Sequence, residues 1–262
     1  MAQGDLTSLA NLKSWLGATT TNNDVVLGRL VSAASASVLR YIARPFVGAT
    51  LVTERYDGRG GDTLVLRQGP VSSIASIAFS GSVITTAATG NPPTGGYILD
   101  CPALQARLIL TDLYFPHGKG QIQVSYWAGW QVAGEAHTAA ASVTPSQLWL
   151  TDVGVTYATG AALTAVAANP AVGQYAVSAA GAYTFSAVDI AANAALLISY
   201  GTAPYDMEQV VLELAGETYS RMDRIGLGSK TLAGQEIITF SQLPLNNAAK
   251  GALDRFRRVA PV

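Results

Sequence analysis

The chain contains few side chains that could act as catalysts or metal ligands. His117 and His137 are its two histidines, and Cys101 is its single cysteine. A structural zinc site needs about four nitrogen or sulfur ligands, and a catalytic thiol needs a base within hydrogen-bond reach. Neither condition is suggested, so we expect exposed histidines and a cysteine that acts as a small buried hydrophobe. We predict no metal, no cofactor and no enzymatic activity.

One segment is similar in composition to a phosphate-binding loop. Gly226-Leu227-Gly228-Ser229-Lys230-Thr231 ends in a Lys-Thr pair. A Walker loop has glycine directly before the lysine and a strand before the glycines, whereas Ser229 precedes Lys230 and a helix is expected first. We therefore interpret Gly226 as a helix stop. Gly58-Arg59-Gly60-Gly61 has no helix after it and is interpreted as a hairpin turn.

Aromatic side chains offer a second kind of chemistry, because they stack on sugar rings. They gather at two places, and the candidates are Tyr126, Trp127 and Trp130, and further along Trp149, Tyr157 and Tyr175. Most of them lie in alternating segments, where core packing is the simpler interpretation. Acid pairs such as Asp206 with Glu208 fall in helical sequence and are explained by helix ends and solvated faces.

The C-terminal segment 247–259 combines apolar and basic residues at helical spacing. We expect Leu253 and Phe256 to anchor on a partner, with Arg255, Arg257 and Arg258 pairing with acidic groups at the rim. Two alternatives stay open, which are contact of the arginines with DNA and packing of the segment on its own domain.

The composition limits the function classes. Of 262 residues, 49% are hydrophobic and 13% are charged, and the net charge is −1. Such a chain folds, and it lacks the basic field of a nucleic-acid-binding protein. We see no apolar run of the roughly 18 residues that a membrane span needs, and no secretory signal at the N-terminus. Low charge with many Ala and Gly residues favours a surface covered by partner subunits.

The pattern of the first 130 residues changes from helical to extended. Helices are predicted over 7–17, with Thr7 as cap and Gly17 as stop, and over 27–42, which ends before Arg44-Pro45. Strands of an antiparallel sheet are then predicted over 51–56, 63–66, 71–79, 107–110 and 122–127, with a long exposed loop at 87–96.

Residues 131–202 differ from the rest, because Glu135, Asp152 and Asp189 are their only formal charges. Alternating runs predict strands over 147–150, 155–157, 174–177, 183–185 and 196–200, as in a small β-sandwich. Ser125-Tyr126 and Ser199-Tyr200 close the strands on either side. We therefore predict an inserted β-domain at 131–202.

After Pro204 the helical period returns, from Met207 to a stop at Gly226, followed by a strand over 236–240 and the final helix over 247–259. The predicted fold class is α+β. Residues 1–130 and 203–262 form a discontinuous core of helices and an antiparallel β-sheet, and 131–202 form an inserted all-β, sandwich-like domain.

The order of these elements resembles the head–tail connector (adaptor) proteins of tailed bacteriophages. The resemblance is carried by the two N-terminal helices, Tyr56-Asp57-Gly58, Gly69-Pro70-Val71-Ser72-Ser73-Ile74, Ser125-Tyr126-Trp127-Ala128-Gly129-Trp130, Pro204 with its helix, Glu236-Ile237-Ile238-Thr239-Phe240 and Leu243-Pro244. It covers about 1–130 and 203–262. The minimal adaptor lacks the insert 131–202.

The resemblance implies a structural virion protein of the neck, made in the host cytoplasm. It implies a self-assembled ring, commonly twelve-fold, beneath the portal protein, and the residues then expected to bind the portal are Leu253, Phe256, Arg255, Arg257 and Arg258. The ring would meet a stopper or tail-completion protein and leave a channel for genomic DNA. The near-neutral charge is compatible with lateral contacts between copies and with DNA that slides without sequence-specific binding. The alternative function is a carbohydrate- or cell-surface-binding module carried on the insert.

Overall fold

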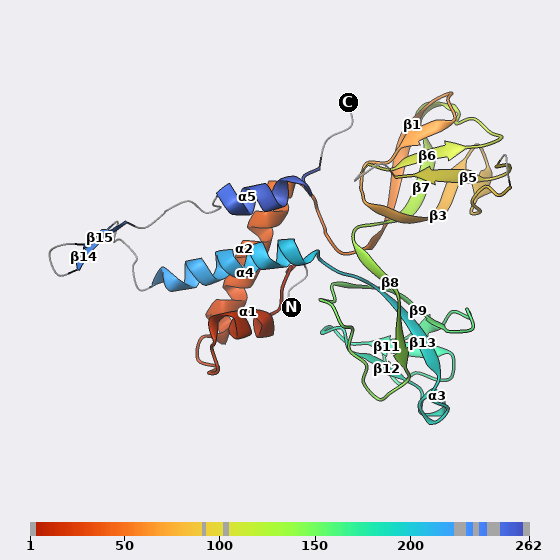
Figure 1. Ribbon diagram of the computed structural model, residues 1–262. Helices are drawn as coiled ribbons and strands as arrows, with labels where there is room; N and C mark the ends of the chain where they lie inside the picture. The colour runs from red at the N-terminus through yellow and green to blue at the C-terminus, as the bar shows by residue number, and fades with distance from the viewer. Residues whose placement is uncertain are drawn as a thin grey trace. The chain divides into compact units, whose positions relative to one another are not determined.

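The chain places helices at its two ends and mostly antiparallel strands between them, an α+β fold as predicted (Figure 1). The computed structural model describes residues 4–90, 93–101, 105–222, 229–232, 236–239 and 247–258. It divides into two compact units: Met1–Pro45 with Pro204–Arg257, and Phe46–Ala203 with Arg258–Val262. The division that the sequence predicts, with 131–202 inserted between 1–130 and 203–262, stays a prediction.

The first unit, here the helical unit, contains α1 (Leu9–Leu16), α2 (Asp24–Ile42), α4 (Tyr205–Ser220) and α5 (Asn247–Asp254). The cap of α1 is Ser8 rather than the predicted Thr7, since Ser8 Oγ accepts a hydrogen bond from the Asn11 amide at 3.0 Å. Gly17 ends α1 in the left-handed conformation, as expected.

Helix α2 is long and apolar enough to cross a membrane, so the expectation that no such stretch exists is wrong by that measure. A helix in the core of a folded unit can have the same length and apolar composition. Helix α2 contacts α1, α4 and α5, and it buries one face that comprises Leu27, Val31, Ala34, Ser35, Val38 and Ile42. Packing within the unit thus accounts for its apolar composition.

A buried carboxylate joins the two ends of the helical unit. Glu208, in the first turn of α4, accepts hydrogen bonds at Oε1 from Thr7 Oγ1 at 2.8 Å and from Asn11 Nδ2 at 2.7 Å. Helix α4 ends at Ser220, earlier in the chain than the predicted stop. That stop, Gly226, lies outside the described residues. A two-stranded hairpin follows, of β14 (Ser229–Leu232) and β15 (Glu236–Thr239).

The second unit holds two β-modules with separate cores. In the first module, β1 (Thr50–Arg59), β7 (His117–Ala128), β3 (Val71–Phe79) and β4 (Ser82–Ile84) form one antiparallel sheet in that order. A smaller sheet follows the order β2 (Thr63–Val65), β6 (Arg107–Leu110), β5 (Tyr97–Asp100). Strands β3 and β6 have the bounds that the sequence predicts.

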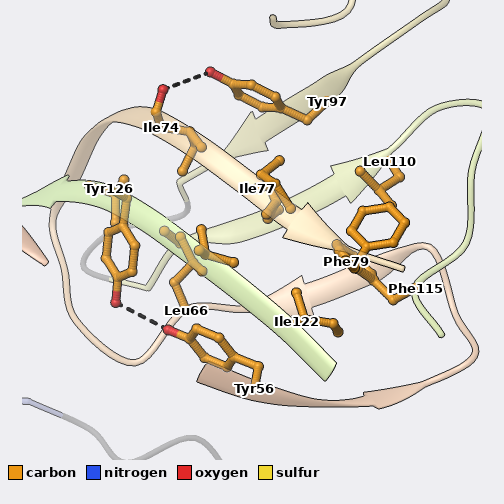
Figure 2. Packing of buried hydrophobic residues seen from close by; sticks show 14 of the residues in the cluster. Tyr56, Leu66, Ile74, Ile77, Phe79, Tyr97, Leu110, Phe115, Ile122 and Tyr126 are labelled. Carbon is orange, nitrogen blue, oxygen red and sulfur yellow. Dashed lines mark hydrogen bonds between the residues drawn. The ribbon is translucent and has the colours of Figure 1, made fainter. Parts of the chain in front are cut away.

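The core of this module lies between its two sheets (Figure 2). Strand β7 is central to the larger sheet and buries every second side chain from Ile122 to Ala128. Phe79 of β3 meets Phe115 edge to face, with ring centroids 5.6 Å apart. Tyr56 and Tyr126 are buried side by side, with their hydroxyl oxygens 3.1 Å apart.

The predicted hairpin at residues 57–62 is wrong. Strand β1 pairs with β7 and β2 pairs with β6, so the two flanking strands belong to different sheets. The register of β1 and β7 shifts between Tyr56 and Gly58. A Cβ atom on Gly58 would lie 1.6 Å from the Pro116 carbonyl oxygen, so glycine is required by close backbone approach and not by a tight turn.

The second β-module spans 131–202, and its core is separate from the first. One sheet has the order β8 (Gln131–Thr138), β13 (Ala195–Gly201), β9 (Thr151–Tyr157), and the other has β10 (Thr164–Ala165), β11 (Gln174–Val177), β12 (Tyr183–Phe185). A short helix, α3 (Ala187–Ala191), precedes β13. Strand β8 was not predicted, and residues 147–150 form no strand.

The chain enters and leaves the second module at one backbone carbonyl. The Trp130 oxygen accepts hydrogen bonds from the amides of Ala49 and Thr202, each at 3.0 Å. Beside it, Thr151 Oγ1 donates to the Ala49 carbonyl oxygen, and Leu150 packs on Gly48. This geometry is compatible with an insertion at 131–202, which stays a prediction.

Candidate interaction surfaces and polar sites

The C-terminal segment packs on its own unit. Leu253 is fully buried and Phe256 is 8% exposed. Arg44 Nε donates to the Phe256 carbonyl oxygen at 2.7 Å, and Tyr41 donates to Asp254 at 2.6 Å. The expectation that Leu253 and Phe256 anchor on a partner is therefore corrected, because their apolar side chains already fill the core beside α2 and α4.

The predicted basic residues of this segment have distinct surroundings. Arg255 pairs with Asp206 at the start of α4, and its guanidinium lies 4.6 Å from the centre of the Phe256 ring. Arg257 lies 6.0 Å from the centre of the Tyr41 ring. Arg258 is half-buried, and its Nε has no hydrogen-bond partner among the residues described. Of these three arginines, Arg255 and Arg257 belong to the helical unit.

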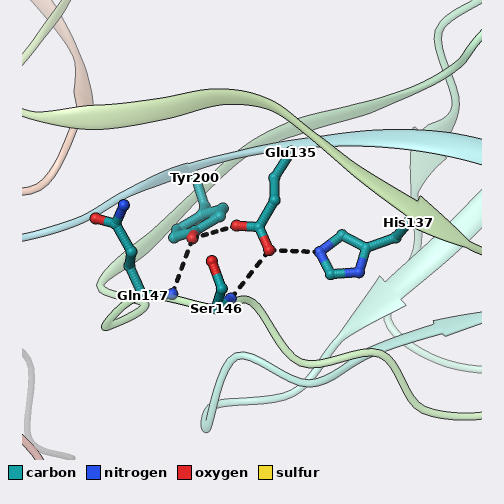
Figure 3. Close-up of polar contacts among 5 residues, drawn as sticks. All are labelled: Glu135, His137, Ser146, Gln147 and Tyr200. Carbon is teal, nitrogen blue, oxygen red and sulfur yellow. Dashed lines mark hydrogen bonds and ion pairs between the residues drawn. The ribbon is translucent and has the colours of Figure 1, made fainter.

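The second β-module contains a polar cluster that sequence reasoning missed (Figure 3). Glu135 of β8 lies 2.7 Å from His137 Nε2, and it accepts hydrogen bonds from the Ser146 amide at 3.0 Å and from the Tyr200 hydroxyl at 2.5 Å. The Gln147 amide donates in turn to the Tyr200 hydroxyl. The alternation of Glu135 and His137 on one face of a strand is the signal that could have indicated this contact.

This cluster positions backbone rather than activating a nucleophile. In a catalytic triad the histidine contacts the serine, but here Glu135 stands between Ser146 and His137. Burial acts to raise the pKa of Glu135, and the hydrogen bonds from Tyr200, Ser146 and His137 outweigh it, so the pKa is lowered. The carboxylate thereby ties residues 146–147 to strands β8 and β13.

The other two carboxylates of the module are held in the same way. Asp152 accepts hydrogen bonds from the hydroxyls of Tyr175 at 2.6 Å and Tyr183 at 2.9 Å. Asp189 accepts from the hydroxyls of Tyr157 at 2.8 Å and Ser186 at 2.6 Å. Each formal charge of residues 131–202 is thus bound to at least one tyrosine hydroxyl.

The aromatic residues proposed as a sugar platform are buried or half-buried. Tyr126 is fully buried and Tyr175 is 3% exposed. Trp149 is half-buried and donates from Nε1 to the Tyr183 hydroxyl at 3.1 Å. Tyr157 is half-buried as well, and Trp127 and Trp130 have intermediate exposure. In the described residues 131–202 these rings do not form the exposed stack that a carbohydrate site would need.

The remaining sequence candidates, Cys101, His117 and Lys230, lie in separate parts of the chain. Cys101 is exposed rather than buried; desolvation of its thiol and the nearby charge of Asp100 raise its pKa, which disfavours the thiolate. His117 begins β7, and its ring lies beside Gly60. Lys230 lies on strand β14, not in a loop, and the glycines before it lie outside the described residues. Among the described residues, no three His, Cys, Asp or Glu side chains form a possible metal site.

Comparison with known proteins found a structural likeness. No family model matches the chain, and no curated protein matches it. A solved structure described as the neck of an empty GTA particle computed with C6 symmetry covers 100% of this chain and 94% of its own, with 15% sequence identity and a TM-score of 0.46. A likeness of this size does not establish a shared fold, and no function is transferred from it.

Proposed function

We propose that this chain is a structural neck protein of a phage-like particle, a head–tail connector that forms a ring beneath the portal protein. The observation that carries the proposal is the construction of the helical unit from both ends of the chain, with the β-modules carried between α2 and α4. The element order that resembles the adaptor proteins likewise places helices at both ends of the chain. In the ring, the stopper or tail-completion protein would lie on the opposite side from the portal, and DNA would pass through the centre.

The portal contact is assigned to Arg255 and Arg257 rather than to the apolar anchors. Leu253 and Phe256 hold α5 on the helical unit, so they act by placing the two arginines. The Arg255 side chain is 61% exposed and forms an ion pair with Asp206. Acidic side chains of a portal subunit would complete these contacts at the rim of an interface.

Assembly with the portal tests the proposal. The full chain is mixed with the purified portal ring of the same particle and examined by mass photometry and negative-stain electron microscopy. We expect a ring with many copies of this chain bound to one portal. A single copy of the protein per purified particle, or no complex with the portal, would contradict the proposal.

A pair of charge reversals tests the contact residues. We expect Arg257→Glu to weaken portal binding by about tenfold or more, as loss of one well-formed charge contact does. Arg221→Glu is the matched control, because Arg221 lies at the other end of α4 and pairs with Glu217. Equal weakening by both variants would indicate a general effect of net charge and would exclude the assigned contact.

A further inference from the structure

Two residues at the C-terminal end of α2 hold the segment that leads to Arg257. Arg44 is 6% exposed, and its Nε donates to the Phe256 carbonyl oxygen at 2.7 Å. In the last turn of α2, the Tyr41 hydroxyl donates to Asp254 Oδ1 at 2.6 Å. Phe256 is itself buried. The residue directly before Arg257 is therefore fixed both by its buried ring and by its carbonyl group.

The side chain of Arg257 lies over an aromatic ring. Its guanidinium carbon is 6.0 Å from the centre of the Tyr41 ring, a distance at which the face of the ring attracts a cation. Arg257 is exposed, and among the described residues its guanidinium forms no ion pair or hydrogen bond. Tyr41 thus contacts the segment twice, through its hydroxyl at Asp254 and through its ring at Arg257.

Arg255 differs from Arg257 in one respect that matters for binding. It too lies over a ring, with its guanidinium 4.6 Å from the centre of Phe256, but it already forms an ion pair with Asp206. The N–H groups of Arg257 are the ones that stay available. A guanidinium held against a ring can offer two parallel N–H groups to a carboxylate, which a lysine ammonium cannot do.

The charges around the two arginines favour a protein carboxylate over a nucleic-acid backbone. Asp206 contacts Arg255, and Asp254 contacts the tyrosine that lies under Arg257. A duplex carries a closely spaced row of phosphates, which would be brought against these two carboxylates. A single carboxylate side chain can reach Arg257 alone.

We propose that Arg257 binds one carboxylate of a portal subunit through two parallel hydrogen bonds, and that Tyr41 is a positioning residue that orients its guanidinium. The inference deepens the proposed function and rests on it. It names the chemical group that the contact recognises and the residue that prepares the contact within this chain.

The affinity of full-chain variants for the purified portal ring tests the inference. We expect Arg257→Lys to weaken binding by about fivefold or more, because the charge is kept and the planar group is lost. Tyr41→Leu should weaken binding by about two- to fivefold, as loss of an exposed cation–π contact does. Tyr41→Phe keeps the ring and should bind like the intact chain. Tyr41→Leu combined with Arg257→Lys should bind no more weakly than Arg257→Lys alone.

Two matched variants on α4 serve as controls. Arg221→Lys makes the same exchange at an arginine that pairs with Glu217. Tyr219→Leu removes a ring whose hydroxyl accepts a hydrogen bond from Asn23 at 2.7 Å. Both should bind the portal ring like the intact chain. Circular dichroism and thermal unfolding establish that each variant folds, and Arg257→Lys, at an exposed position, tests the contact even if Tyr41→Leu does not fold.

The outcomes separate this inference from the proposed function. If Arg257→Lys binds the portal ring as strongly as the intact chain, the paired hydrogen bonds are overturned and the connector function stands. If the losses of the two single variants multiply in the double variant, or if Tyr41→Phe is as weak as Tyr41→Leu, the positioning role of the ring is overturned. Binding of a short duplex DNA that Arg257→Lys abolishes, with portal binding unchanged, would assign Arg257 to phosphate instead. If the intact chain forms no complex with the portal, the proposed function fails and this inference with it.

Discussion

Tyrosine hydroxyls bound to carboxylates are the recurring polar contact of the β-modules. Glu54 of the first module accepts from Tyr56 at 2.5 Å and from Tyr126 at 2.8 Å, and the second module repeats the pairing at Glu135, Asp152 and Asp189. Burial, together with these contacts, raises the pKa of Tyr126 to about 12. The pairs satisfy buried polar groups in cores that contain few other charges.

Removal of one such carboxylate is expected to destabilise the second module. Asp152→Ala leaves the buried hydroxyls of Tyr175 and Tyr183 without their acceptor. We expect a loss of about 1–3 kcal/mol in the free energy of unfolding. Urea unfolding followed by tryptophan fluorescence measures it, because Trp149 bonds to Tyr183. Asp152→Asn keeps one acceptor oxygen and should lose less, and an equal loss in both variants would contradict this explanation.

Glu135 makes stability depend on acid pH. Its pKa is lowered in the folded chain, so its contribution is present above the ordinary glutamate pKa of about 4.3 and is lost as the pH falls through the lowered value. We expect Glu135→Gln to be less stable than the intact chain near neutral pH and to lose less stability on acidification. Urea unfolding at neutral pH and at about pH 3 compares the two. Parallel pH dependence of both proteins would show that Glu135 is not responsible.

At the scale of elements, α5 is a structural part of the helical unit. Leu253 is fully buried against the unit, so we expect Leu253→Ala to lower its free energy of unfolding by about 2–5 kcal/mol. Arg255→Ala should change it by less than about 0.5 kcal/mol, because its exposed ion pair contributes little. Thermal unfolding followed by circular dichroism distinguishes them. An unchanged melting temperature for Leu253→Ala would restore the idea that the segment is held by a partner.

Local pattern predicted the elements well and their pairing poorly. The period of α2 and the end at Gly17 follow from apolar spacing and a glycine stop, which are short-range signals. Strand β8 was missed because its Ala, Gly and Thr residues show no apolar alternation; its place comes from pairing with β13, far along the chain. The pairing of β1 and β2 was also mispredicted. The turn-like sequence between them suggested a hairpin, but β1 pairs with β7 and β2 pairs with β6.

For the candidate site too, the sequence indicated the local element but not its long-range contacts. The sequence indicated the basic C-terminal helix, but burial of Leu253 depends on α2, about 210 residues away, and no local rule reports it. Tyr157 joins the Gly173 amide to the Asp189 carboxylate through its hydroxyl, which the spacing of the three residues does not reveal.

Glycine at close approaches sets the shape of the sheets. Gly129 has φ +115, and a Cβ atom there would lie 2.6 Å from the carbonyl oxygens of Val47 and Gly48. We expect Gly129→Ala to destabilise the second unit by more than about 1 kcal/mol, because strain and a clash coincide. Gly134→Ala is the control, with positive φ but open space around it. Equal melting temperatures of the two variants would show that the close approach does not matter.

At the scale of the whole molecule, the second β-module should be separable. We expect a chain in which a short linker joins Gly129 to Ala203 to remain a folded, cooperative protein, because the two β-modules have separate cores. It loses the contacts of Leu150 and Thr151 with Gly48 and Ala49, so its melting temperature should be lower. Circular dichroism and thermal melting measure this, and a molten product would contradict the insertion.

The Trp130 carbonyl, which accepts from both Ala49 and Thr202, brings the two ends of the second module to one place. Genetic exchange at such a point alters the length of the chain between 130 and 202 while the flanking backbone keeps its position. Related chains should therefore differ most here, with the module absent, duplicated or replaced by an unrelated one, while the helices at both ends change by substitution alone. The lineage of the module and that of the rest of the chain can then be different.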